Sequence, residues 1–248
     1  MVAGLVSIIM PSYNCDKFIS DTIYSVLNQS YKEWELLIVD DKSTDNSVNV
    51  ITEFIKKDDR VQLFKQKVNS GAASCRNLAI EKSKGEFIAF LDSDDLWLPK
   101  KLEVQINFMM NNDYNFTHTS YFFIDEFNNK LSKTYQAKKK LTYNDMLYSN
   151  RIGCLSVVLN QSMIGKIFMP NLRKRQDYGH WLNILKIEKF AYGIEEPLAK
   201  YRLRENSMSS NKLEMLKWNF KLFHKTQHFS LIKSFYFVLC NVFIKIKE

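Results

Sequence analysis

The chain has 248 residues, enough for one large α/β domain or for one domain with an appended segment. Hydrophobic residues make up 46% of it and aromatic residues 14%, which argues against disorder over most of its length. The formal net charge of +8 favours an anionic partner: a nucleic acid, a phosphorylated small molecule or an anionic membrane surface.

The cysteines and the N-terminal segment suggest a cellular compartment. The chain has four scattered cysteines, Cys15, Cys75, Cys154 and Cys240. They show neither C-x-x-C spacing nor a neighbouring His at metal-binding spacing, so we expect reduced thiols in a cytoplasmic chain. The N-terminal segment lacks a basic region and reaches Pro11 early, which predicts a first strand and no signal peptide. The apolar run 234–244 is shorter than the roughly 20 residues that a membrane span needs.

The first half of the chain alternates between strand and helix patterns. Nearly continuous apolar runs predict buried strands at 5–10, 34–40, 61–65 and 86–92. The segments between them carry apolar residues at helical spacing, and the third helix is expected to end at Gly85. This alternation predicts an α/β fold with a doubly wound, mostly parallel central sheet flanked by helices.

Polar residues follow three of the predicted strands. They are Pro11 and Tyr13 after the first strand, Asp41 after the second, and Asp92, Ser93, Asp94 and Asp95 after the fourth. Ligands of such sheets bind beyond the carboxyl ends of the strands, so we expect these groups to open onto one crevice.

The three aspartates between 92 and 95 allow two interpretations. Carboxylates this close repel one another unless a cation lies between them. A divalent cation held there could neutralise a nucleotide diphosphate, because the phosphate-binding loops G-x-x-x-x-G-K-[ST] and G-x-G-x-x-G are missing. The alternative is a solvated turn in which Asp95 caps the next helix. At the other strand ends, Pro11 and Tyr13 could face a flat base and Asp41 could accept a uracil imide N–H, or all three could be local turn residues.

The second half differs in pattern. A strand and turn are predicted over 115–130, a helix capped at Thr142, a strand over 153–159 and an amphipathic helix over 176–187. No clear linker separates the halves, so we expect one domain over 1–212, with a nucleotide-binding half (1–112) and an acceptor-binding half (113–212). Residues 213–248 form a basic amphipathic helical tail, which either docks on an anionic membrane or packs on the domain with its lysines in solvent.

Seven segments resemble, in order and spacing, family 2 glycosyltransferases with the GT-A fold. They are VSIIMPSYN, SVLNQSY, WELLIVDDKSTDNS, NSGAASCRN, KGEFIAFLDSDDLWLPKKLE, RQDYGHWL and EPLAKYRLRENSMSSNK. The second half is similar to the branch that makes teichuronic acid, O-antigen and capsule. The resemblance implies inverting, Mn²⁺- or Mg²⁺-dependent transfer of a hexosyl or N-acetylhexosaminyl group from a nucleotide-sugar, expected to be a UDP-sugar. The acceptor would be a hydroxyl of a glycan, expected to be lipid-linked, in bacterial cell-surface polysaccharide biosynthesis.

The resemblance also assigns roles to residues. Donor-binding positions are Pro11, Tyr13, Asp41, Arg76, Asp92, Ser93, Arg202 and Arg204. The metal would bind Asp94 with Asp92 beside it, whereas Asp95 is a ligand in some relatives and structural in others. Asp177 takes the catalytic-base position, in a pair that reads Gln176-Asp177 where relatives have Glu-Asp.

Three further positions, Arg204, His180 and Trp181, each have two possible roles. Many relatives have a His where Arg204 stands, and an arginine can contact phosphate but cannot ligate a metal. His180 and Trp181 lie near Asp177 in the sequence and could contact the acceptor, or pack in the core.

Other classes of protein compete with a transferase. A metal-dependent phosphohydrolase could use the same aspartates, and a catalytically weak member could bind a sugar nucleotide as a scaffold. Nucleic-acid binding is not expected, because the lysines are dispersed and no helix-turn-helix, RNP-type or zinc motif accompanies them. We expect a cytoplasmic protein, with peripheral attachment to the inner face of the membrane through the tail.

Overall fold

The structure, a computed structural model, describes residues 1–204 and 212–247. Within these residues a mixed sheet of ten strands forms the centre, with eight of them in the order β3-β2-β1-β4-β9-β6-β10-β5. The remaining two, β7 and β8, pair with β6 and β10. The strands are β1 (Val2–Ser12), β2 (Trp34–Asp40), β3 (Val61–Lys65), β4 (Gly85–Phe90), β5 (Leu96–Trp97), β6 (Phe116–Ile124), β7 (Lys130–Tyr135), β8 (Lys140–Leu141), β9 (Val158–Asn160) and β10 (Ala191–Arg202).

The first four strands form the parallel part of the sheet. β1 pairs in parallel with β2 and β4, and β2 pairs in parallel with β3. β9 then runs antiparallel between β4 and β6, and β10 returns parallel to β6. The predicted fold class, a mostly parallel sheet flanked by helices, is therefore confirmed.

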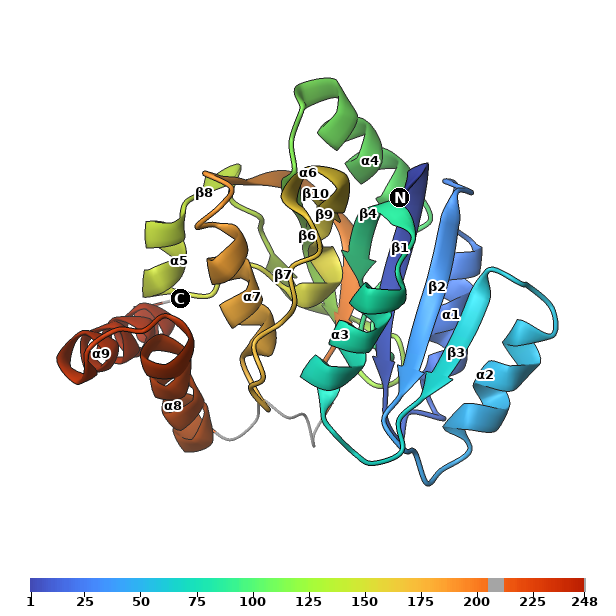
Figure 1. The fold of residues 1–248 in the computed structure, drawn as a ribbon, viewed down its shortest axis with the longest axis horizontal. Helices are drawn as coiled ribbons and strands as arrows, with labels where there is room; N and C mark the ends of the chain where they lie inside the picture. Colours follow the sequence, from blue (N-terminus) through green and yellow to red (C-terminus); the bar gives the residue numbers. More distant parts are fainter. Residues whose placement is uncertain (205–211, 248) are drawn as a thin grey trace.

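Helices cover both faces of this sheet (Figure 1). They are α1 (Ile19–Leu27), α2 (Ser47–Ile55), α3 (Ala72–Lys82), α4 (Lys101–Asn112), α5 (Tyr143–Tyr148), α6 (Gln161–Ile164), α7 (Gln176–Ile184), α8 (Lys212–Lys221) and α9 (Leu231–Lys247). Short turns of other helical types occur at Cys154–Ser156 and Leu222–Thr226. Thr142 caps α5 as predicted, in a reciprocal capping box with Asp145.

Strand β1 shows how the sheet separates two apolar cores. Ile8 and Met10 are fully buried on one face, among residues of α1, α2 and α4. Ile9 is fully buried on the other face, among residues of α3 and α7. Successive side chains of a strand point to opposite faces, so a strand covered on both sides is apolar at most of its positions.

Several predicted boundaries are wrong. The helix predicted over 176–187 ends at Ile184, and the strand predicted over 153–159 begins only at Val158, after the turn Cys154–Ser156. α3 ends at Lys82, and Gly85 instead begins β4. A Cβ atom at Gly85 would lie 2.4 Å from the carbonyl oxygen of Leu5, so the close approach of β1 requires a glycine there. Asp95 does not cap the next helix either, because α4 begins at Lys101 after Lys100.

The tail packs on the second half of the domain. α8 and α9 lie at the opposite end of the molecule from β3 and α2 (Figure 1). Leu222, Phe223, Phe237 and Val238 are buried and join the apolar core that also contains Trp181. None of the helices in the described parts of the chain has the length and apolarity needed to cross a bilayer.

Candidate active site

The carboxyl ends of β1, β2 and β4 lie side by side, as their parallel pairing requires. The backbone N–H of Asp41 donates to the carbonyl of Ser12 at 2.8 Å, which joins the ends of the first two strands. Pro11 is half-buried and Tyr13 is 49% exposed, so the Tyr13 ring is accessible at this edge. Both residues lie where a base could be bound, and their contact with one stays a prediction.

Asp41 holds the start of α3. Its carboxylate accepts hydrogen bonds from the backbone N–H groups of Ser70 at 2.7 Å and Gly71 at 2.8 Å. Gly71 has a φ of +88°, in the left-handed region that favours glycine. Burial, with the charge of Asp41 added, raises the pKa of the Cys75 thiol to about 12. Asp41 is thus a buried structural carboxylate as well as a candidate base contact, a role that its sequence neighbourhood did not indicate.

Arg76, on α3, is a buried cation that interacts with carboxylates from both halves of the chain. Its guanidinium is ion-paired with Asp92, which follows β4, and its side chain is only 4% exposed. Burial by itself would lower the pKa of Arg76, but the negative charges of Asp92 and Asp177 raise it above its ordinary value. Two of its nitrogens, Nε and Nη1, are buried and have no hydrogen-bond partner among the described residues. Arg76 therefore has donor capacity that remains unused.

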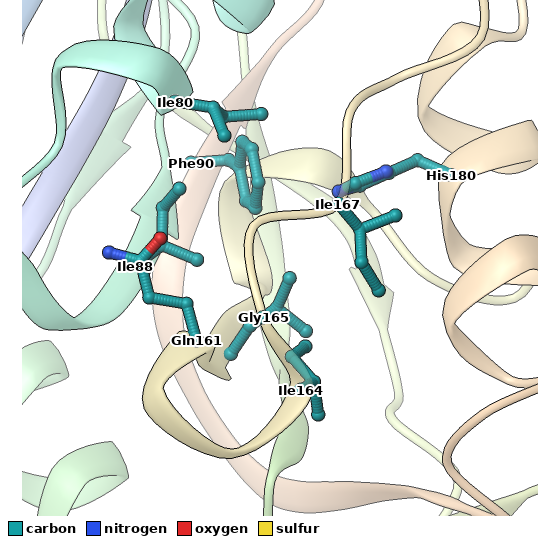
Figure 2. Close-up of a pocket in the computed structure, with 9 residues that line it drawn as sticks. Ile80, Ile88, Phe90, Gln161, Ile164, Gly165, Ile167 and His180 are labelled. Carbon is teal, nitrogen blue, oxygen red and sulfur yellow. The ribbon is translucent and has the colours of Figure 1, made fainter.

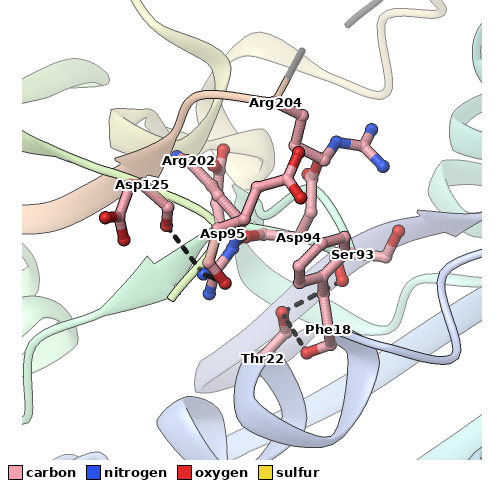
Figure 3. A network of polar contacts seen from close by, with 9 residues as sticks. Phe18, Thr22, Ser93, Asp94, Asp95, Asp125, Arg202 and Arg204 are labelled. Carbon is pink, nitrogen blue, oxygen red and sulfur yellow. Dashed lines mark hydrogen bonds and ion pairs between the residues drawn. The ribbon is translucent and has the colours of Figure 1, made fainter. Parts of the chain in front are cut away.

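Asp94 and Asp95 are held by two arginines from the end of β10 and just beyond it (Figure 3). Arg204 Nε lies 2.7 Å from Asp94 Oδ2. The backbone N–H of Arg202 donates to Asp95 Oδ1 at 2.8 Å, and Asp95 is 2% exposed. Burial raises the pKa of Asp94, as does the charge of Asp92, whereas the charge of Arg204 lowers it. Asp94 is the more accessible of the two and Asp95 is tied to the strand.

The Arg202 side chain is 3% exposed and is bound by the protein. Its Nε donates to the Asp94 carbonyl at 2.7 Å, and Nη1 donates to the carbonyls of Asp125 and Glu126 at 3.1 and 3.2 Å. Nη2 donates to Asn128 Oδ1 at 2.7 Å. These bonds lock the loop after β6 against the loop that follows β4, residues 92–95, which we call the acidic loop. Of the two predicted phosphate contacts, Arg204 is the one with an accessible side chain, at 34% exposure. The rest of that predicted segment, residues 205–211, lies outside the described residues.

Ser93 is anchored through its backbone. Thr22 Oγ1, on α1, donates to the Ser93 carbonyl at 3.1 Å. Figure 3 shows this contact beside the ring of Phe18, which lies under the guanidinium groups of Arg202 and Arg204 at 4.9 and 5.6 Å. A hollow of about 310 Å³ opens here, lined by residues of the loop after β1 and by Glu126 and Arg204. The hollow lies next to the cationic group that faces Asp94.

Asp177 lies in the first turn of α7 and is half-buried. Its charge acts on Arg76 together with that of Asp92, as described above. The same two carboxylates raise the pKa of the buried Cys154 thiol, after the larger effect of burial, while Arg76 lowers it. The predicted base from the second half of the chain and the first aspartate of the acidic loop therefore act on the same two buried groups, Arg76 and Cys154. Gln176 beside Asp177 is 5% exposed.

His180 and Trp181 do not face this crevice in the structure. Trp181 is fully buried and contacts the Phe90 ring edge-on, with 5.4 Å between ring centroids. His180 is 1% exposed and lines a small cavity of about 10 Å³ with mostly apolar side chains, among them Ile88 and Ile167 (Figure 2). Asp177 at the start of α7 is accessible, whereas the following turn packs into the core. An acceptor contact by either side chain would require the core to open.

Tyr201 was missed as a site residue. Burial raises the pKa of its phenol, and so do the charges of four carboxylates, which are Asp95, Asp92, Asp94 and Asp177. Its ring packs against Phe123 on the neighbouring strand β6, at 5.6 Å between centroids. The sequence indicates a role for Tyr201 only through its position directly before Arg202, in one of the seven segments that resemble the family.

The acidic loop can supply one or two carboxylate ligands to a divalent cation. Within residues 1–204 and 212–247, no three His, Cys, Asp or Glu side chains gather as a complete metal site. Mg²⁺ in phosphate-handling sites is commonly held by one or two carboxylates and completed by substrate phosphates and water. Burial is the largest cause of the raised pKa of Asp94, and the charge of Asp92 adds to it. A cation bound here would compensate the repulsion between these two carboxylates. Asp94 is the residue best placed to bind such an ion.

Comparisons with known proteins identify the family. The family model described as glycosyl transferase family 2 matches residues 7–168. TuaG of Bacillus subtilis (strain 168), whose name refers to teichuronic acid biosynthesis, is 43% identical over 230 residues, which are 93% of this chain and 91% of TuaG. WfgD of Escherichia coli, named as a UDP-Glc:α-D-GlcNAc-diphosphoundecaprenol β-1,3-glucosyltransferase, is 44% identical over 214 residues, 86% of this chain and 83% of WfgD.

A solved structure with the same fold is the mannosyltransferase PcManGT from Pyrobaculum calidifontis, in complex with GDP-Man and Mn²⁺. It superposes with a TM-score of 0.68 at 14% identity, over 91% of this chain and 64% of that one. The chain belongs to glycosyl transferase family 2, and its fold is the GT-A fold. The resemblance of the seven sequence segments to this family is thereby confirmed.

Proposed function

We propose that the chain is an inverting glycosyltransferase that moves a hexosyl or N-acetylhexosaminyl group from a UDP-sugar to a glycan hydroxyl. The observation that carries this proposal is the buried guanidinium of Arg76, which is ion-paired with Asp92 of the acidic loop and whose pKa is also raised by the charge of Asp177 on α7. A donor-binding carboxylate and a candidate base from different halves of the chain thus act on one buried cation. The name of WfgD, with its UDP-Glc donor and diphosphoundecaprenol-linked acceptor, supports a lipid-linked acceptor here as well.

In this proposal the acceptor hydroxyl attacks the anomeric carbon of the sugar from the face opposite the diphosphate. Asp177 accepts the hydroxyl proton as the new C–O bond forms. The bond from the anomeric carbon to the phosphate oxygen breaks, and the leaving nucleoside diphosphate takes its electron pair. Arg204 lies beside Asp94 at the edge of the hollow, where it can donate to that developing charge.

Asp94 would hold the divalent cation, with Asp92 next to it. When bound, the cation supplies charge stabilisation to the diphosphate oxygens. The Mn²⁺ in the PcManGT complex supports this assignment by analogy of fold. Asp95, whose carboxylate accepts from the Arg202 backbone, would position the loop and stay out of the ligand set.

A transfer assay tests the proposal. The chain is incubated with radiolabelled UDP-glucose, Mn²⁺ and GlcNAc-diphosphate on a short lipid, and the lipid product is separated by chromatography. A product whose new linkage is β by NMR, from the α-configured donor, supports inverting transfer. UDP-N-acetylglucosamine and GDP-mannose serve as alternative donors in parallel reactions.

The competing functions give different results in the same assay. A phosphohydrolase would consume the donor at the same rate without the acceptor. A scaffold would bind the donor in calorimetry and release no UDP in any reaction. Either pattern, obtained over a panel of donors and acceptors, would overturn the proposed function.

A further inference from the structure

The outer helix of the tail, α9, has two opposite faces. Ser234, Phe237, Val238 and Asn241 repeat at helical spacing and are 0 to 7% exposed, so this face packs on the domain. Four other residues form what we call the apolar ridge: Ile232, Phe235, Leu239 and Phe243. Their spacing of three and four residues places them on the opposite side of the helix.

The apolar ridge is open to solvent. Ile232 is 85% exposed and Phe243 is 63% exposed, and Phe235 and Leu239 are 57% and 42% exposed. Burying a side chain of this size fully contributes about 1.5–3 kcal/mol. Single exposed apolar residues are common, but several on one helix face indicate a surface that is covered when the protein works.

The positive charge of the tail indicates what covers the ridge. Between Glu214 and Glu248 the chain has no acidic residue and six lysines, which are Lys217, Lys221, Lys225, Lys233, Lys245 and Lys247. Lys217, Lys225 and Lys233 are exposed. Lys233 is the immediate neighbour of Ile232, and its Nζ lies 4.1 Å from the centre of the Phe229 ring. Cations next to an uncharged apolar face match a surface that presents anionic groups above hydrocarbon.

We propose that the apolar ridge of α9 docks on the surface of an anionic lipid bilayer. The helix lies parallel to the surface, with the ridge in the boundary between headgroups and acyl chains and Lys233 among the headgroups. The 17-residue helix lies on the membrane and does not cross it. A second copy of the chain would also cover apolar side chains, but it would bring six like charges toward six, which opposes that pairing. The docking does not depend on the transfer reaction proposed above.

Vesicle co-sedimentation of the full chain tests this inference. The ridge variant carries Ile232→Ser and Phe243→Ser. The control carries Met110→Ser and Ile187→Ser, two positions of similar exposure, 66% and 64%, that lie outside the tail. With vesicles of phosphatidylcholine and 30% phosphatidylglycerol we expect the ridge variant to bind at least tenfold more weakly than the unmodified chain, and the control within twofold. Binding should also fall at least tenfold with pure phosphatidylcholine or in about 1 M salt.

Three results would overturn the inference. They are no binding of the unmodified chain to anionic vesicles, equal binding by the ridge variant, and equal binding to neutral vesicles. Sedimentation velocity identifies the competing occupant: a dimer that the ridge substitutions convert to a monomer would assign the ridge to a second copy. Circular dichroism and thermal melting confirm that both variants fold. Transfer to a water-soluble acceptor, measured separately, reports on the proposed function and leaves the docking result unaffected.

Discussion

The guanidinium of Arg76 and the carboxylate of Asp92 form an ion pair that joins α3 to the loop after β4. The two residues are 16 positions apart, and the arginine is the more deeply buried, at 4% against 32% exposure. The charge of Asp177 also raises the pKa of this guanidinium, so one buried cation interacts with carboxylates from both halves of the chain. Removing it should therefore affect the fold and the site together.

Substitution of Arg76 by Met leaves Asp92 without its cation. We expect the free energy of unfolding to fall by about 2–3 kcal/mol, below the full cost for a buried pair because Asp92 is partly exposed. Urea denaturation followed by circular dichroism measures the change. Lys56→Met, in a pair whose side chains are 64% and 61% exposed, should cost less than about 1 kcal/mol. Equal losses in the two variants would show that the Arg76 pair has no special structural role.

Replacing Asp177 with Asn removes the proposed base and nearly preserves its shape. We expect kcat to fall by about 10²–10⁴, the usual contribution of general base catalysis. Calorimetric affinity for the UDP-sugar should stay within about threefold, since the donor is bound elsewhere in the crevice. Asp113→Asn, at the exposed end of α4, makes the same chemical change away from the site. Substantial turnover by the Asp177 variant would remove this residue from the mechanism.

The metal role of Asp94 can be tested through donor binding. We expect Mn²⁺ to tighten binding of the UDP-sugar by at least tenfold in the unmodified chain and EDTA to reverse it. In Asp94→Asn the donor affinity should be nearly the same with and without Mn²⁺. Asp125→Asn is the control, because Asp125 lies beside Arg202 and outside the acidic loop. An unchanged Mn²⁺ effect in the Asp94 variant would exclude this residue as the ligand.

The two arginines near the acidic loop should differ in what their loss affects. Arg202→Met removes the hydrogen bonds that the guanidinium donates to the carbonyls of Asp94, Asp125 and Glu126, so we expect a loss of about 3 kcal/mol in stability. Arg204→Met, at an accessible position, should change stability by less than about 1 kcal/mol and weaken UDP binding at least fivefold. Thermal melting and calorimetry on both variants test this contrast, and a reversed pattern would contradict it.

His180 should make the protein sensitive to acid. Burial lowers the pKa of His180 to about 3, against about 6.5 in an unfolded chain. Between these values the unfolded chain binds a proton that the folded chain does not, so the free energy of unfolding falls as the pH falls. At pH 5 the loss from His180 alone is about 2 kcal/mol. Burial lowers the pKa of His118 to about 4, which acts in the same direction.

Urea denaturation at pH 7.5 and pH 5.0 measures this dependence. His180→Leu should lose less stability between the two values than the unmodified chain does, because one of the two buried imidazoles is gone. His228→Asn changes an exposed histidine and should retain the full dependence. A His180 variant with unchanged pH dependence would contradict the prediction.

The parallel half of the fold could be predicted because its physical signal is local. A strand buried on both faces is apolar at most of its positions, as β2 is, and β2 and β3 have the predicted bounds. The strand ends could be placed together for the same reason, since parallel strands share an edge. Pro11, Asp41 and the acidic loop therefore lie at one edge.

The contribution of β10 could not be predicted in this way. Its burial pattern alternates irregularly, and its pairing with β6 shifts register around Pro197. Its partner β5 has only two residues, too few for any periodicity. The enclosure of Arg202 and the position of Tyr201 depend on that pairing, so they became visible only in three dimensions.

The bond from the Arg202 N–H to Asp95 also sets an order of events during synthesis. Its partners are 107 residues apart in the chain. At about 5–20 residues per second, a ribosome needs on the order of 10 s to reach the arginine after making the aspartate. During that interval β1 to β4 are already available to pair, while the acidic loop has neither β10 nor its two arginines. The strands of the parallel half are thus made first, and Asp94 and Asp95 remain without their two arginines until the last strand is made.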